Sequence, residues 1–220
     1  MTTSIKISKK CSVCDKTSEH EELTSTNSFG SPDLDLRPPE MKRSTMNLWI
    51  QCCPHCGYCA PDISGYVLDF VPDIVKSEAY QEQLKDKKYP ELANWFLCSA
   101  MLLEREKKYE EAGQYCLNAA WACDDAEEEE EAVQCRKKAI EFLKMAKEAK
   151  QSFSQKPGEE EALLADLYRR TSQFDLAIQI CNEGIKEQPQ DQLVKILKYQ
   201  IELCRKRDNT CHRIEEALGE

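Results

Sequence analysis

From Pro72 onward, apolar side chains recur at intervals of three and four residues, with polar residues between them. This spacing places the apolar side chains on one side of an α-helix, so the pattern predicts a series of helices. Pro90 suits the first turn of one helix, and the sequence Lys156-Pro157-Gly158 ends another. The predicted helical segments are residues 73–84, a pair within 90–125, and then 126–151, 159–170, 174–187 and 191–207.

The first 60 residues have a different composition and pattern, because Ser, Thr, Pro and Cys dominate and no helical period is present. Residues 46–52 show the period-two alternation of a strand, and residues 20–26 are its candidate partner. Residues 27–42 are too rich in Gly and Pro to form a regular element. This change of composition and pattern predicts two domains, an N-terminal segment over residues 1–70 and a helical domain over residues 71–220.

Two stretches of the helical part repeat the same order of small and aromatic residues, in windows that begin at Ala93 and Gly158. The offsets are those of the tetratricopeptide repeat, in which a small residue on the first helix lets the second helix pack closely. A generic antiparallel helical bundle with coincidental small residues is the alternative. The matched positions are Ala100 with Ala165, Tyr109 with Phe174, Ala112 with Ala177, Cys116 with Cys181, and Ala119 with Gly184.

Arrays of such hairpins bind peptide segments of partner proteins in a groove lined by the first helix of each pair. The sequence therefore predicts a protein or peptide partner in the helical-repeat groove. The positions expected to face the groove are Asn94, Leu97, Met101, Glu104, Asp166 and Arg169.

The chain has a net charge of −10, and the whole acidic excess lies in residues 61–220. Nucleic-acid binding needs a basic surface, so we expect no nucleic-acid partner. No apolar run approaches the length that spans a bilayer, so we expect no membrane partner. The start MTTSIKISKK lacks the apolar core of a signal peptide, and the thirteen cysteines are odd in number. These features favour a protein of the reducing cytoplasm over a disulfide-bonded one.

Two Cys-x-x-Cys pairs, Cys11 with Cys14 and Cys53 with Cys56, stand 38 residues apart. A two-residue gap lets one tight turn direct both sulfurs at a single ion, and zinc favours four tetrahedral thiolates. Gly57 follows the second pair, where the turn needs a positive φ, and Asp15 takes that place after the first. Four thiolates leave no open coordination position, which predicts a structural Zn²⁺ site, although iron uses the same ligand set. The predicted fold class is therefore mainly α, a tetratricopeptide-like antiparallel helical-hairpin array with a small N-terminal β zinc ribbon.

The segment CCPHCGYCA also contains Cys52 and Cys59, so Cys56 with Cys59 is another possible pair. We favour Cys53 with Cys56, because Pro54 and Gly57 frame that pair. A thioredoxin-like dithiol would need a βαβ context, which the N-terminal segment lacks. The histidines near the pairs, His20 and His55, are expected not to be ligands.

The order CSVC, SPDLDLRPPEM and WIQCCPHCGYCA, followed by the helical repeats, resembles a bacterial family described only as zinc-ribbon proteins of unknown function. The resemblance covers nearly the full length and is most specific over residues 11–60. It implies a cytoplasmic protein and supplies no reaction.

No phosphate-binding loop, HExxH motif or GxSxG motif occurs in the sequence, so we expect no enzymatic activity. The function predicted from the sequence is a non-enzymatic zinc-binding protein whose helical scaffold mediates protein–protein interaction. A thiol-based redox or metal sensor that uses the four-cysteine site is the alternative. The loop Phe29–Met41 either packs against the rest of the chain or presents a contact site for a partner.

Overall fold

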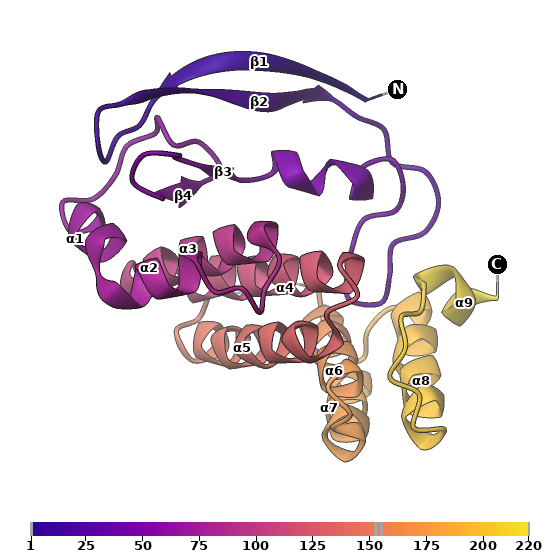
Figure 1. Cartoon of the computed structure of the whole chain (residues 1–220). Coiled ribbons are helices and arrows are strands. Elements are labelled where there is room, and N and C mark those ends of the chain that lie inside the picture. Colours follow the sequence, from indigo (N-terminus) through magenta and orange to yellow (C-terminus); the bar gives the residue numbers. More distant parts are fainter. Residues whose placement is uncertain (1, 152–153, 155, 220) are drawn as a thin grey trace.

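The computed structural model describes residues 2–151, 154 and 156–219. The chain is mainly helical, and two small antiparallel sheets lie at its N-terminal end (Figure 1). In order, the elements are β1 (Thr3–Lys10), β2 (Thr17–Ser25), the 3-10 helix η1 (Arg43–Leu48), β3 (Gln51–Cys52), β4 (Cys59–Ala60), α1 (Val71–Lys76), α2 (Glu78–Leu84), α3 (Glu91–Arg105), α4 (Tyr109–Asp125), α5 (Glu129–Glu148), α6 (Glu159–Arg170), α7 (Phe174–Lys186), α8 (Asp191–Arg205) and α9 (Ile214–Leu218).

The strand pairing differs from the prediction for residues 46–52. β2 pairs antiparallel with β1, with Lys10 opposite Thr17, and β3 pairs with the short strand β4. Residues 46–48 of the predicted strand belong to the helix η1, and residues 51–52 form β3. The turn of η1 is closed by Thr45, whose hydroxyl donates to the Lys42 carbonyl and accepts from the Trp49 indole. Residues 20–25 lie in a strand as expected, but the predicted pairing of residues 20–26 with residues 46–52 is wrong.

The helices α3, α4 and α5 lie side by side beneath the two sheets (Figure 1). The helices α6 and α7 run crosswise to α3, α4 and α5 (Figure 1). Three-residue connections join α3 to α4, α4 to α5 and α6 to α7. Each connection holds one residue of positive φ: Lys107 at 58°, Glu127 at 61° and Ser172 at 60°. The same turn therefore recurs at each of these three junctions.

The segment predicted as one helix over residues 73–84 forms two short helices. Ser77 separates the two helices, because its backbone is extended, with φ −63° and ψ 149°. Its hydroxyl accepts a hydrogen bond from the Tyr80 amide and so caps α2. The helix therefore breaks at a capping serine, although the apolar spacing continues across it.

The main hydrophobic core runs without interruption from the sheet of β3 and β4 into the helices, through Ile50, Ile63, Tyr80, Phe96 and Leu117. A second, smaller cluster joins α6, α7 and α8. The division into two domains near residue 70 stays a prediction. Six cysteines in the helices are buried as small apolar side chains: Cys98, Cys116, Cys123, Cys135, Cys181 and Cys204.

Several positions predicted to face a partner groove are covered by the chain itself. Asn94 is buried beneath the end of α2, where its amide donates to the Asp86 carbonyl at 2.8 Å. Arg169 is buried by the C-terminal segment. Leu97 and Asp166 are buried too, so the predicted orientation of these four residues is wrong. The two groove positions that keep exposed surface are Met101 and Glu104.

Among the helices within residues 2–151 and 156–219, none is both long enough and apolar enough to cross a lipid bilayer.

Candidate metal centre

The four predicted ligand cysteines converge on one point of the structure. Their sulfur atoms all lie within 4.8 Å of one another. The Sγ atoms of Cys11 and Cys56 are 3.7 Å apart, and those of Cys14 and Cys53 are also 3.7 Å apart. The structure therefore brings together residues from two segments that the sequence separates widely.

These sulfur distances fit a tetrahedral ion. A zinc–sulfur bond of about 2.3 Å places the corners of a regular tetrahedron about 3.8 Å apart. All four cysteines are unbridged thiols, so every sulfur is available as a ligand. The donor set and its spacing thus fit Zn²⁺, or iron in the same ligand geometry.

The two Cys-x-x-Cys turns have the same backbone geometry. In the second, the Gly57 amide donates to the Cys53 carbonyl at 2.9 Å, and Gly57 has φ +81°. In the first, the Asp15 amide donates to the Cys11 carbonyl at 2.9 Å, and Asp15 has φ +59°. The positive φ predicted at both positions is confirmed.

The protonation of the thiols reflects their shared enclosure. Burial raises the pKa of Cys11 and the pKa of Cys56 above the ordinary thiol value. Burial acts in the same direction on Cys53, but hydrogen bonds from the backbone amides of Cys56 and His55 outweigh it and lower the pKa of Cys53. A divalent cation would supply the positive charge that four thiolates in this space require.

The neighbouring candidates lie outside the sulfur cluster. Among the described residues, the metal-ligand geometry includes neither Cys52 nor Cys59. The His55 ring nitrogen contacts the Thr17 carbonyl at 3.3 Å, and the His20 ring nitrogen contacts Ser18.

Two supporting residues were not singled out by the sequence. The Tyr80 hydroxyl donates to the Gly57 carbonyl and accepts from the Cys59 amide, each at 3.1 Å, and so holds the second turn against α2. Lys9 forms ion pairs with Glu22 and Asp62 beside the first turn. Tyr80 lies in an ordinary helical pattern, and no local motif marks either residue.

Gly57 gives a direct test of the second turn. We expect Gly57→Ala to destabilise the ribbon by about 1–2 kcal/mol, because an L-residue pays that cost in the left-handed region. The added Cβ would also lie 2.3 Å from the Leu84 Cδ2 atom, so that side chain must move. Thermal unfolding and chelator competition measure the effect.

The matched control for this substitution is Asp15→Gly at the equivalent position of the first turn. It removes the same backbone strain, so we expect unchanged or slightly higher stability. Equal losses for both variants would show that the left-handed conformation is not what the position requires.

The loop Phe29–Met41 is anchored by its own buried charges, which pair with residues of other elements. Asp33 pairs with Arg43 at 2.6 Å, and Arg37 pairs with Asp125 at the end of α4, also at 2.6 Å. Asp35 accepts a hydrogen bond of 2.8 Å from the Trp121 indole. The loop therefore packs against the helices, as one of the two sequence interpretations predicts.

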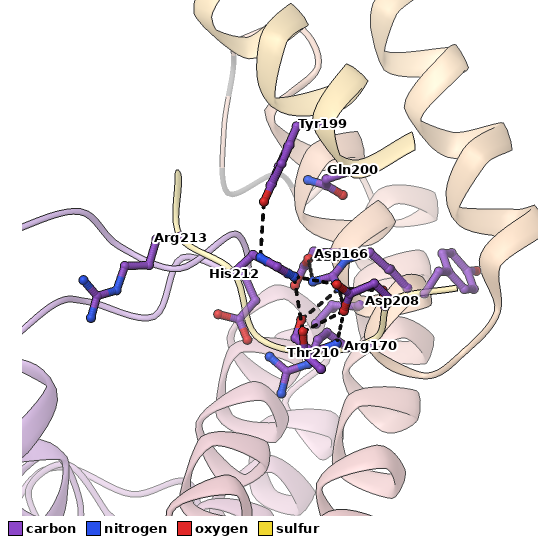
Figure 2. A network of polar contacts seen from close by, with 12 residues as sticks. Asp166, Arg170, Tyr199, Gln200, Asp208, Thr210, His212 and Arg213 are labelled. Atoms are coloured by element: carbon purple, nitrogen blue, oxygen red, sulfur yellow. Dashed lines mark hydrogen bonds and ion pairs between the residues drawn. The ribbon is translucent and has the colours of Figure 1, made fainter. Parts of the chain in front are cut away.

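The C-terminal segment also holds this loop, through backbone hydrogen bonds. The Leu34 amide donates to the His212 carbonyl, and the Ile214 amide donates to the Pro32 carbonyl, each at 2.9 Å. Figure 2 shows the His212 imidazole among Tyr199, Asp208 and Thr210.

The comparisons with known proteins give one match. The sequence model of a family described as uncharacterized proteins conserved in bacteria (DUF2225) matches residues 5–206. No curated protein and no solved structure was found to match. Since the match covers both cysteine pairs and every helix from α1 to α8, the chain belongs to this bacterial family.

Proposed function

We propose that this protein is a non-enzymatic zinc-binding scaffold for protein–protein interaction. Zinc would join Cys11 and Cys14 to Cys53 and Cys56 and so fix the N-terminal ribbon on the helices. The observation that carries the proposal is the cluster of four sulfurs within 4.8 Å. Four thiolates fill the tetrahedral coordination of zinc, which suits a structural role.

The packing of the helical hairpins supports a tetratricopeptide-like array. The small residues matched between the two sequence windows lie in the α3–α4 and α6–α7 hairpins, and Ala100, Ala112, Ala165 and Ala177 are buried there. A Cβ at Gly184 would lie 2.8 Å from the Glu161 Cβ, so α6 and α7 approach too closely for a larger residue. Close approach at small residues is what this repeat requires.

A partner surface is supported by the loop Phe29–Met41. Its charged residues Asp33, Asp35 and Arg37 are buried, whereas Phe29 and Leu36 are 62% and 46% exposed. The ion pairs of Asp33 and Arg37 fix the backbone, and the apolar side chains point outward. Exposed apolar side chains on a rigidly held loop suit recognition by another protein.

Affinity capture from the native cell tests the interaction. We expect wild-type protein to retain a reproducible partner, and Phe29→Ala together with Leu36→Ala to lose it. Leu176→Ala is the matched control, because Leu176 on α7 is 44% exposed and lies outside the loop. A partner lost equally in the control, or no reproducible partner, would contradict the proposed surface.

Metal analysis of the purified protein tests the zinc. We expect one zinc ion per chain and a colourless protein. A coloured protein that contains iron would show that the site holds iron and not zinc. A protein without metal would contradict the proposal.

A further inference from the structure

Cys52 and Cys59 form a second thiol site that the metal cluster does not use. They lie directly opposite each other in the antiparallel pair of β3 and β4. The Cys53 amide donates to the Tyr58 carbonyl, and the Cys59 amide donates to the Tyr80 hydroxyl. Cys52 and Cys59 are therefore a non-hydrogen-bonded cross-strand pair.

This kind of pair brings side chains closest together. Opposite Cα atoms in it are about 4.5 Å apart, which lies within the range that a disulfide spans. Successive residues of a strand point to opposite faces, so Cys52 faces away from the side of its ligand neighbour Cys53. Oxidation of the pair need not consume a metal ligand.

The two thiols differ in access to solvent. Cys52 is partly exposed and lines a cavity of about 660 Å³, which the ligand cysteines Cys53 and Cys56 also line. Cys59 is fully buried behind it. Of these two thiols, a small oxidant that enters the cavity would therefore meet Cys52, which leaves Cys59 as the resolving thiol.

We propose that Cys52 and Cys59 are a hydroperoxide-reactive dithiol that closes to a disulfide across β3 and β4. The Cys52 sulfur attacks the hydroperoxide, the O–O bond breaks, an alcohol or water leaves, and Cys52 becomes a sulfenic acid. The Cys59 sulfur then attacks the Cys52 sulfur, the S–O bond breaks, and the hydroxide leaves with the Cys59 proton as water. The two thiols lose two electrons and the peroxide gains them.

The proposal is tested by treating the purified full-length protein with hydrogen peroxide. The free thiols are then alkylated, and the peptide that contains residues 52–59 is fragmented. We expect a Cys52–Cys59 disulfide, reversed by dithiothreitol, while Cys53 and Cys56 are alkylated only after denaturation. In Cys59→Ser, Cys52 should stop at its sulfenic or sulfinic acid. Free N-acetylcysteine in the same tube shows whether the peroxide dose is sufficient to oxidise an ordinary thiol.

Cys98→Ser is the matched control, because the Cys98 thiol is a neighbour of Cys59 and is fully buried. This variant should still form the disulfide. A Cys59–Cys98 disulfide, a disulfide that contains Cys53 or Cys56, or unreacted Cys52 when the free thiol is oxidised would overturn the proposal. Metal content is measured first, so a metal-free protein that still forms the disulfide would contradict the zinc proposal alone.

Discussion

Cys14→Ser is expected to lose the bound metal and to unfold the N-terminal ribbon while the helical part stays folded. The hairpin of β1 and β2 has almost no core, since Lys9 is the one buried side chain in these two fully described strands. Structural zinc supplies on the order of 10 kcal/mol of apparent folding free energy in small zinc domains. A hairpin without a core cannot replace that contribution. Metal analysis and residue-resolved hydrogen exchange measure the result.

The exchange pattern makes this prediction specific. Amides of β1, β2 and the turn at residues 53–57 should lose protection, whereas amides of α4 and α5 should keep it. Chelation of the wild-type protein should give the same pattern. Cys211→Ser is the control, because Cys211 is exposed and lies outside the sulfur cluster. A Cys14→Ser protein that keeps its metal and its melting temperature would contradict the four-thiolate site.

The candidate metal site could be predicted from the sequence because its determinants are local. The two-residue spacing and the residue after each pair dictate a turn that directs two sulfurs to one side, and Gly57 and Asp15 have the expected positive φ. The helices were predictable for a similar reason, since their apolar period is set by the burial of one face. Even so, the break at Ser77 was missed, because the apolar spacing continues across it.

The parts that could not be predicted depend on contacts between distant segments. β1 and β2 hold one buried position between them, so the sequence carries little of the apolar alternation that marks a half-buried strand. The Ser31 hydroxyl accepts from the Glu215 amide across 184 positions of the chain. Burial of Asn94 and Arg169 arises in the same way, from segments that cover the predicted groove. A periodic pattern reports that a face is buried and does not identify what covers it.

Arg169→Met is the second substitution with a large expected effect, about 3–5 kcal/mol, the usual cost of breaking a buried ion pair. The Arg169 guanidinium is fully buried and donates to the Asp166 carboxylate, at 2.6 Å from Nη2. Its Nη1 donates to the carbonyls of Asp208 and Thr210, each at 2.8 Å. Removal leaves a buried carboxylate and two carbonyls unpaired. Denaturant unfolding measures the loss, and limited proteolysis within residues 206–214 reports release of the C-terminal segment.

Two further variants separate the charge from the packing. Arg205→Met on α8 removes an exposed arginine, and we expect a change within about 0.5 kcal/mol. Burial already raises the pKa of Asp166 despite the neighbouring Arg169, so much of the cost should come from the stranded carboxylate. Asp166→Asn added to Arg169→Met removes that charge and should recover part of the stability. The C-terminal segment should stay susceptible to protease, because its two carbonyls still lack a donor. If the double variant lost more stability than Arg169→Met, the unpaired carboxylate would not be the origin of the cost.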